Sequence, residues 1–577
     1  MSDNLEDLLH RARTEDIDDS LILRLAVIGE NERKIIDILK GGGSHLLQGA
    51  RGCGKSMLFK TAESEQDNDF QKDKCLGVYV NFKTSTLLEG VKADHRDAFQ
   101  IWVGAKILQA LFDKLTALNL IGSETATDPF HRIFGIKSIF GMKQAIQEKI
   151  HLLQKLSKKD SIKKTIEDLG EDFLDKAYDI GYLHEVLKEI VNEYQIQRVI
   201  FLFDEAAHTF IPSQQEIFFE IFKLLHGGNI AVKAAVYPTV TSYGRNFEIG
   251  HDAIVVEMGK FQPGTVGRSS NRTMFRELLD KRLPAKPSIR KKIYSKGQLL
   301  DHCIDLSTGN PRTFLHLFNR LFDKGYTDRA LSLVTQEYID DELLPYHKGL
   351  AKRLPKYAHH VKIGLDLLRG YIIPEIRKKN HRDKKTKYQS AFFTTQRDLP
   401  ANLKLALDIL SYSGILSKQG TVKIAERKTG QRYMVHLAYM YTEKAFSSTS
   451  LATIMVSLSL TDYREFSSAD PQLDTYLKSL KEASDECTQC SAELPSNAKF
   501  CLECGHKVEQ TSIIGQLLEE SVFELSISDK IATRLERGFP KVGDVIHATR
   551  NEIMRIPYIK EVRSKIIKNA ADEFISG

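Results

Sequence analysis

The stretch Gly49–Ser56, GARGCGKS, has the spacing G-x-x-x-x-G-K-[ST] of a phosphate-binding loop. Its glycines let backbone N–H groups approach phosphate oxygens, Lys55 can reach the β- and γ-phosphates of ATP, and Ser56 can hold Mg²⁺. A glycine-rich turn with an accidental lysine is the alternative. The motif predicts a nucleotide site formed by Gly49, Gly52, Cys53, Gly54, Lys55, Ser56 and Met57.

Two acids, Asp204 and Glu205, follow the apolar run Val199–Phe203. A continuous apolar run of this length is typical of a central parallel strand that is buried on both faces. At the carboxyl end of such a strand, Asp204 can bind the water shell of Mg²⁺, and Glu205 can orient or deprotonate the attacking water. Together with the phosphate loop, the acids favour ATP hydrolysis over ATP binding alone.

Four of the seven cysteines form two C-x-x-C pairs. Each pair directs two thiolates to one metal, so the four predict a closed tetrahedral Zn²⁺ site with a structural role. Disulfides are the alternative, but nothing in the sequence suggests export. The expected zinc ligands are Cys487, Cys490, Cys501 and Cys504.

Strands and helices alternate around these motifs. SHLLQ before the phosphate loop predicts a buried strand, SMLFKTA after it a helix, CLGVYVNFKT a second strand, and residues 97–118 a long amphipathic helix. The pattern predicts an α/β core with a parallel sheet. Residues from about 120 to 180 are expected to be a helical insertion before the strand that carries the acids.

Two further segments can reach the γ-phosphate. NIAVKAAVYPTVTSYG predicts a buried strand with Thr239, Thr241 and Ser242 at its end, where a hydroxyl can sense the γ-phosphate or simply cap a turn. In GNPR, Asn310 and Pro311 begin a helix, so the guanidinium of Arg312 can be aimed. A positioned cation is what a γ-phosphate needs.

Over roughly residues 25–325 the chain resembles AAA+ ATPases of the origin-recognition and cell-division-control type, and their relatives, the signal-transducing STAND ATPases. The resemblance rests on the order of five segments: IGENERKII, GARGCGKS, VIFLFDE, a strand with a polar end, and GNPR. The resemblance implies that Lys55 and Ser56 are the phosphate-loop pair, that Asp204 and Glu205 are the metal-water and base pair, and that Arg312 is the sensor-2 arginine of a helical lid. It also implies an arginine finger supplied by another subunit, for which the candidates are Arg245, Arg268, Arg272 and Arg276.

The same resemblance implies a winged helix after the lid. LPANLKLALDILSYSGIL predicts a helix, and TVKIAERK and QRYMVHLAYMY predict two strands joined in a hairpin at Thr429-Gly430. The basic run Arg377–Lys387 is either a solvated loop or a phosphate contact, and the wing can lie along a phosphate backbone. Winged helices also serve as protein contacts. The basic residues of the wing are Arg427, Lys428 and Arg432, and the helix offers only Asn402 and Lys404 to base edges.

The carboxyl-terminal segments resemble two small nucleic-acid-binding modules. CTQCSAELPSNAKFCLECGHKV is similar to small zinc ribbons, and residues 527–574 resemble tandem helix-hairpin-helix units. Gly538 and Gly543 keep the first hairpin pattern, whereas the second has Pro557–Lys560 where two glycines are expected. A protein-docking module is the alternative. The cations that can act on DNA by charge are Lys560, Arg563, Lys565 and Lys568.

The length and composition of the chain limit which classes of protein it can belong to. The 577 residues carry a net charge of +6, no apolar run long enough to span a membrane, and an acidic start unlike a signal peptide, so we expect a soluble cytoplasmic protein without membrane partners. The predicted divisions are an N-terminal segment (1–28), an ATPase core (29–258), a helical lid (259–330), a winged helix (345–450), a linker (451–483), a zinc ribbon (484–508) and a helix-hairpin-helix region (515–577).

Two functions fit these features. The first is an AAA+ switch that hydrolyses ATP with Mg²⁺ and binds DNA through the winged helix and the zinc-binding tail, as a homo-oligomer or with partner subunits. The second is a STAND-like ATPase of signalling or anti-phage defence, triggered by a protein partner.

Overall fold

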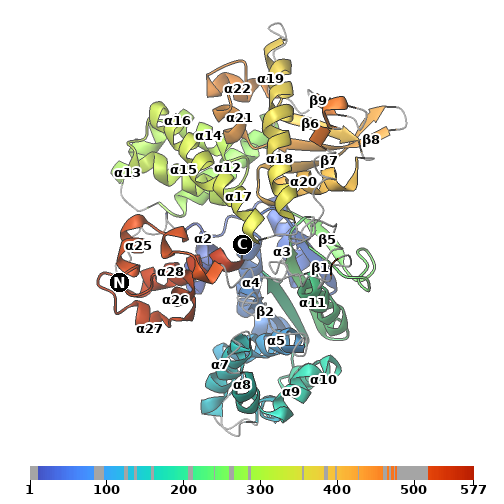
Figure 1. Cartoon of the computed structure of the whole chain (residues 1–577). Helices are drawn as coiled ribbons and strands as arrows, with labels where there is room; N and C mark the ends of the chain where they lie inside the picture. Colours follow the sequence, from blue (N-terminus) through green and yellow to red (C-terminus); the bar gives the residue numbers. More distant parts are fainter. Residues whose placement is uncertain are drawn as a thin grey trace.

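The structure is a computed structural model, and Figure 1 shows its parallel sheet in the middle, with helices of the N-terminal half below it and a second sheet above. The described residues are 9, 11–83, 97–121, 128–135, 139–156, 162–205, 212–238, 241–258, 265–283, 287–353, 357–382, 388–396, 399–425, 428–458, 464–466, 470–473, 475–476, 504 and 517–576.

Five parallel strands form the central sheet in the order β2-β3-β4-β1-β5. The predicted α/β core is therefore confirmed. β3 and β4 lie inside the sheet and are apolar along almost their whole length, as burial on both faces requires. The strands are β1 (Ser44–Gln48), β2 (Cys75–Asn81), β3 (Arg198–Asp204), β4 (Ile230–Val236) and β5 (Ile254–Glu257).

Alternate residues of β3 face two separate hydrophobic cores. Phe201 and Phe203 pack on one face with side chains of α5, α10 and α11, while Ile200 and Leu202 pack on the other face with side chains of α3 and α4. The two-residue period of a strand thus places helices on both sides of the sheet. These helices are α3 (Glu30–Lys40), α4 (Lys55–Asp73), α5 (Asp97–Ala117), α10 (Ile180–Glu193) and α11 (Pro212–Leu225).

The described parts of the segment from about 120 to 180 contain several helices, whose apolar side chains extend the core beside α5. They are α6 (Asp128–Phe134), α7 (Ile139–Lys155), α8 (Ile162–Leu169) and α9 (Glu171–Tyr178).

The helices that follow the central sheet share one core with the second sheet. Two π-helical stretches, Tyr338–Leu343 and Leu368–Ile372, join consecutive helices in this region. The helices are α12 (Thr265–Asp280), α13 (Pro287–Tyr294), α14 (Gly297–Leu306), α15 (Pro311–Asp323), α16 (Asp328–Glu337), α17 (Leu344–Arg353), α18 (Ala358–Leu367) and α19 (Ile373–Arg382).

The second sheet has the order β7-β8-β6-β9 and corrects two details of the expected hairpin. Thr429 and Gly430 are not its turn: they lie within β8, opposite Lys423 and Val422 of β7. Leu437–Thr442 of the second expected strand is a helix, α21. The remaining elements are β6 (Phe392–Gln396), α20 (Ala401–Tyr412), β7 (Leu416–Ala425), β8 (Lys428–Val435), α22 (Leu451–Ser457) and β9 (Arg464–Phe466).

The segment expected to be a linker after residue 450 contains packed structure. Ile454 and Met455 of α22 and Phe466 of β9 are buried in the core of the second sheet, and β9 pairs in parallel with β6.

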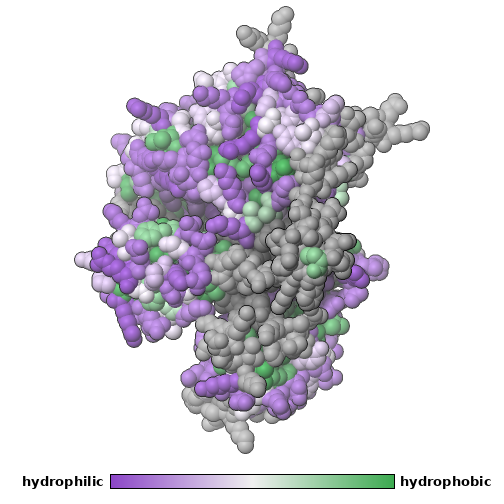
Figure 2. Space-filling model, viewed as in Figure 1, coloured by the Kyte–Doolittle hydropathy of each residue, from purple (hydrophilic) through white to green (hydrophobic). Residues whose placement is uncertain are grey.

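The C-terminal unit, residues 517–576, is a small group of helices beside the N-terminal segment in Figure 1. Figure 2 shows that the described surface on this side of the molecule is mostly hydrophilic. Among the described residues no helix is long and apolar enough to cross a membrane. The elements are η10 (Val522–Glu524), α25 (Asp529–Leu535), α26 (Val542–His547), α27 (Arg550–Ile553) and α28 (Glu561–Ser576), with η1 (Thr14–Asp16), η2 (Asp19–Leu21) and α2 (Ile22–Leu25) in the N-terminal segment.

Candidate nucleotide site

The phosphate loop connects the end of β1 at Gln48 to the start of α4 at Lys55. Gly52 and Gly54 have φ angles of +77° and +100°, which L-residues rarely adopt. A Cβ atom on Gly52 would lie 2.9 Å from the Asn310 side-chain oxygen. These glycines are needed both for the backbone path of the loop and for the close approach of the lid.

Lys55 begins α4 and turns back under the loop. Its Nζ donates hydrogen bonds to the carbonyls of Gly49 (2.8 Å) and Ala50 (3.0 Å) and lies 3.9 Å from the centre of the Tyr237 ring. Burial lowers the pKa of Lys55, while the Cys53 and Asp204 side chains favour its charged form. The ammonium group is therefore held at the loop by carbonyls and an aromatic face.

Asp204, the last residue of β3, is buried and receives several hydrogen bonds. The Tyr79 hydroxyl donates to its Oδ2 at 2.8 Å, and the backbone N–H of Glu205 donates to its Oδ1 at 3.0 Å. Burial raises the pKa of Asp204, whereas hydrogen bonds from Ser56 and Tyr79 and the charge of Lys55 lower it. Ser56 and Asp204, the two expected Mg²⁺ ligands, are thus brought together.

Tyr79 is a site residue that the sequence patterns did not single out. It lies on β2, whose parallel register with β3 sets Asn81 opposite Asp204. The Asn81 amide donates to the Tyr79 hydroxyl at 3.3 Å, which leaves the tyrosine proton directed to Asp204. Tyrosine is frequent in strands, so only its alignment with the acid reveals this role.

Glu205 follows the strand in a left-handed conformation with φ of +60°. This conformation costs a non-glycine residue about 1 kcal/mol or more and is common where a side chain has been directed for function. It turns the chain away from β3 immediately after Asp204, so the two acids do not continue the alternation of the strand.

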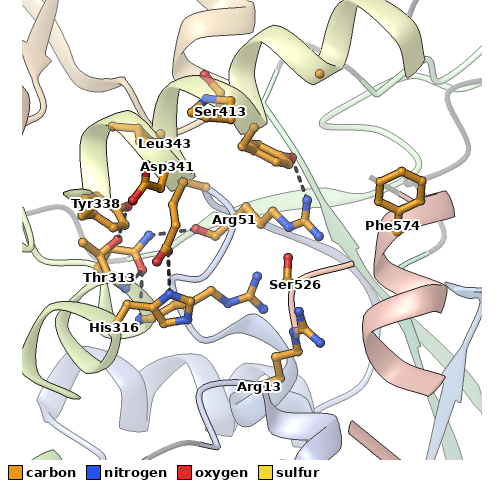
Figure 3. Close-up of a pocket in the computed structure, with 18 of the residues that line it drawn as sticks. Arg13, Arg51, Thr313, His316, Tyr338, Asp341, Leu343, Ser413, Ser526 and Phe574 are labelled. Carbon is orange, nitrogen blue, oxygen red and sulfur yellow. Dashed lines mark hydrogen bonds and ion pairs between the residues drawn. The ribbon is translucent and has the colours of Figure 1, made fainter. Parts of the chain in front are cut away.

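Arg312 lies beside the phosphate loop because Asn310 fixes the start of α15 there. The Asn310 side chain accepts hydrogen bonds from the backbone N–H groups of Arg312 (3.0 Å) and Thr313 (3.2 Å), and its amide donates to the Arg51 carbonyl at 2.8 Å. One side chain therefore caps the helix and ties it to the loop. Figure 3 shows Arg51 and Thr313 in this region of the pocket.

After β4, the Thr241 hydroxyl forms hydrogen bonds within the turn. Thr241 donates to the Tyr237 carbonyl at 2.9 Å and accepts from the Tyr237 N–H, which agrees with the turn-capping alternative. The Ser242 N–H donates to Gln215. Thr239 lies outside the described residues.

Three of the four arginine-finger candidates are engaged within the chain. Arg272 contacts Asp305 at 2.5 Å, Arg276 contacts Asp301 at 2.6 Å, and Arg268 donates to the Met455 carbonyl at 2.6 Å. Arg245 is exposed in the loop after β4. Assembly of several subunits stays a prediction.

Only some of the basic side chains on α19, α20 and β8 are exposed to solvent. Arg377 donates to the Glu443 carbonyl and Lys378 pairs with Glu375, whereas His381 and Arg382 are exposed at the end of α19. Eight of the twelve residues of α20 are buried, so this helix presents mainly Asn402 and Lys404 at its N-terminal end. Arg427 lies outside the described residues, and Arg432 is partly buried.

Most of the groups in the C-terminal unit that were expected to contact phosphates form hydrogen bonds or ion pairs within the chain. Lys568 donates to the carbonyls of Val545, Ile546 and Ala548, and Arg563 donates to that of Tyr558. The N–H groups of Gly538 and Phe539 both donate to the Leu535 carbonyl. The ammonium group of Lys568 thus lies at the end of α26, bonded to carbonyls of its own unit.

The four-cysteine prediction cannot be compared with the structure, because Cys487, Cys490 and Cys501 lie outside the described residues. Cys504 is exposed. Among the residues that the structure does describe, no three His, Cys, Asp or Glu side chains gather as a metal site.

We expect Tyr79→Phe to weaken the use of Mg²⁺, because Asp204 loses a hydrogen bond that favours its charged form. A hydrogen bond to a charged group contributes about 1.5–3 kcal/mol, so the pKa of Asp204 should rise further. The acid limb of the single-turnover ATP hydrolysis rate should move up by about one pH unit. Titration of the rate with pH and Mg²⁺ measures this effect.

Tyr178→Phe is the matched control, since Tyr178 is 47% exposed at the end of α9. An acid limb and a Mg²⁺ dependence that are the same in Tyr79→Phe and in the control would show that Tyr79 does not position Asp204.

Comparisons with known proteins show which family and which solved structures the chain is similar to. The ORC-CDC6-like family model matches residues 13–285. A solved structure of the Aeropyrum pernix ORC1 protein in complex with DNA is 12% identical, with a TM-score of 0.30, covering 74% of this chain and 95% of that chain. One of the Aeropyrum pernix ORC2 protein, in ADPNP-ADP complexes, is 11% identical, with a TM-score of 0.31, covering 74% of this chain and 94% of that chain. No curated protein sequence matches.

The matched residues contain the phosphate loop, both acids and all five strands of the parallel sheet. Over residues 13–285 the chain is therefore similar to the ORC-CDC6-like family.

Proposed function

We propose that the chain is a Mg²⁺-dependent ATPase that associates with DNA. The observation that carries the ATPase part is the convergence of three elements on one loop: α4 brings Lys55, β3 brings Asp204, and α15 brings Arg312 through the Asn310–Arg51 hydrogen bond.

Each of these residues has a defined task. Lys55 and the loop N–H groups bind the β- and γ-phosphates, and Arg312 offsets charge that develops on the γ-phosphoryl group. The Ser56 hydroxyl and the Asp204 carboxylate are oxygen ligands of the kind that Mg²⁺ prefers, and the bound ion would neutralise phosphate charge. Glu205 orients the attacking water and accepts its proton.

Lys55→Ala should abolish tight ATP binding, because the β- and γ-phosphates lose the lysine ammonium group of the loop. Glu205→Gln should bind ATP as the wild type does but hydrolyse it at least about 10²-fold more slowly, because the amide cannot accept the proton. Calorimetry measures binding, and single-turnover kinetics measures hydrolysis.

The two variants control each other, since one removes binding and the other removes only the chemical step. Tight ATP binding by Lys55→Ala would exclude the phosphate-loop assignment. An unchanged single-turnover rate for Glu205→Gln would assign the base to another residue.

DNA association is supported by exposed cations at the end of α19, which projects from the top of the molecule in Figure 1. Lys378 and Arg382 are exposed there, and the run continues in the sequence with Lys384 and Lys385. Cations on a projecting helix end can contact a phosphate backbone without reading bases. The C-terminal unit contributes other exposed cations, among them Arg537 and Lys541 at its first hairpin.

Replacing Lys378, Arg382, Lys384 and Lys385 by glutamine should weaken binding to duplex DNA by a similar factor for every sequence. The slope of log affinity against log salt should flatten by about 0.9 for each phosphate that the variant no longer neutralises. Fluorescence anisotropy at several salt concentrations measures both quantities.

The matched control replaces four exposed lysines that are scattered over the ATPase region, namely Lys34, Lys72, Lys164 and Lys188. DNA binding by the α19 variant equal to that of this control would exclude α19 as the contact. A wild-type chain that does not bind DNA in about 100 mM salt would exclude DNA association and favour the signalling switch triggered by a protein partner.

The C-x-x-C pairs support a structural Zn²⁺ site in the tail, since their spacing supplies four thiolates to one tetrahedral ion. Purified protein should contain one zinc per chain, and Cys501→Ser should lose it while ATP binding is retained. Metal analysis measures the zinc, and a wild type without zinc, or with these cysteines in disulfides, would contradict the site.

A further inference from the structure

The C-terminal unit has a hydrophobic core of its own. Every buried apolar side chain of that core comes from residues 517–575, including Val522, Leu535, Val545 and Ile567. No apolar residue of the ATPase region belongs to it among the described residues. What holds the unit in place must therefore be sought in its polar contacts.

Several of its polar contacts join α28 to the N-terminal segment and to Lys83 after β2. The Asn569 side-chain amide donates to Asp16 Oδ1 at 2.5 Å, and Lys83 Nζ donates to the Asn569 carbonyl at 3.1 Å. Lys565 lies 3.6 Å from Asp18. Asn569 is thus bonded to two segments of the ATPase region at once.

Both of those segments belong to the surroundings of the nucleotide site. Lys83 follows β2, and its N–H donates to Asn81, whose amide bonds to the Tyr79 hydroxyl that donates to Asp204. A continuous series of hydrogen bonds therefore joins the catalytic edge of the sheet to α28.

Asp16 belongs to the second of these segments, which reaches the pocket directly. Three residues before Asp16, Arg13 lines the same cavity as Gly49 and Arg312. Two residues farther along the chain, Asp18 is the partner of Lys565. A shift of η1 would therefore change the pocket and the junction together.

The C-terminal unit also forms a wall of that cavity, which has a volume of about 1840 Å³. Phosphate-loop and lid residues line one side, and residues of the C-terminal unit, among them Ser526 and Phe574, line another. Figure 3 shows Arg13, Ser526 and Phe574 around the same space as Arg51.

We propose that the C-terminal unit closes the cavity beside the phosphate loop, which Gly49, Cys53 and Arg312 also line, and that its docking through Asp16, Asn569 and Lys83 is coupled to ATP binding. This inference rests on the ATP binding proposed above. ATP stabilises the docked unit by keeping η1 in place, and the docked unit slows ATP dissociation. Coupling of this kind is reciprocal: each event changes the equilibrium of the other by the same factor.

Asn569→Asp tests the coupling in the full chain, because it sets a carboxylate against that of Asp16 with almost no change of shape. We expect ATP affinity to fall about tenfold, within the usual range of such coupling, mainly through faster dissociation. Hydrogen exchange of the backbone amides of residues 11–18 should become faster, and ATP should no longer slow it as in the wild type.

Two further variants make the result specific. Asn551→Asp adds the same charge at an exposed position of the same unit and should behave as the wild type. Asp16→Asn combined with Asn569→Asp rebuilds an amide–carboxylate pair in the opposite sense and should restore both ATP affinity and protection from exchange.

The outcomes separate this inference from the proposed function. If Asn569→Asp exposes residues 11–18 but binds ATP as the wild type does, or leaves exchange there unchanged, the coupling is wrong while ATP binding stands. If the wild type itself does not bind ATP, both proposals fail.

Discussion

The nucleotide site depends on how three strands pair: β1 and β3 are both parallel to β4 and lie on either side of it. All strands of a parallel sheet point the same way, so the loop after β1 and the acid at the end of β3 must emerge at one edge, separated by a single strand. The burial of β4 on both faces keeps that separation fixed. Lys55 and Asp204, which are 149 residues apart in the sequence, are thereby held at one site, and β2 adds Tyr79 at the same edge.

A single amide, that of Asn310, extends this constellation beyond the sheet. Because it caps α15 and also donates to the Arg51 carbonyl, the helix can move away from the loop only by breaking that second hydrogen bond. Gly52 permits this contact, since any side chain there would collide with Asn310. Asn310 thus attaches the lid directly to the phosphate loop.

The sequence predicted the elements of the ATPase core well, because a spaced motif and a continuous apolar run are local signals. The expected hairpin turn at Thr429-Gly430 was wrong, since turn composition competes with strand pairing and pairing prevailed. Tyr79 acquires its role, and Asn310 its contact with Arg51, only from register and packing. The charge of Lys568 was visible in the sequence, but the three carbonyls that surround it come from a helix end elsewhere in the unit. Charge patterns show which groups are cationic and not whether they reach solvent.

The outer edge of the central sheet has a consequence for self-association. Among the described strands β2 lies at one edge of the central sheet, and an edge strand with unpaired N–H groups invites pairing with a second chain. Here the outward N–H of Tyr79 donates to Glu63 of α4, and Glu63 is in turn held by Lys114 at 2.7 Å. A carboxylate and an ammonium group thus cover the position at which a foreign strand would have to bind. The protein can expose the catalytic end of its sheet without offering that strand as a template for aggregation.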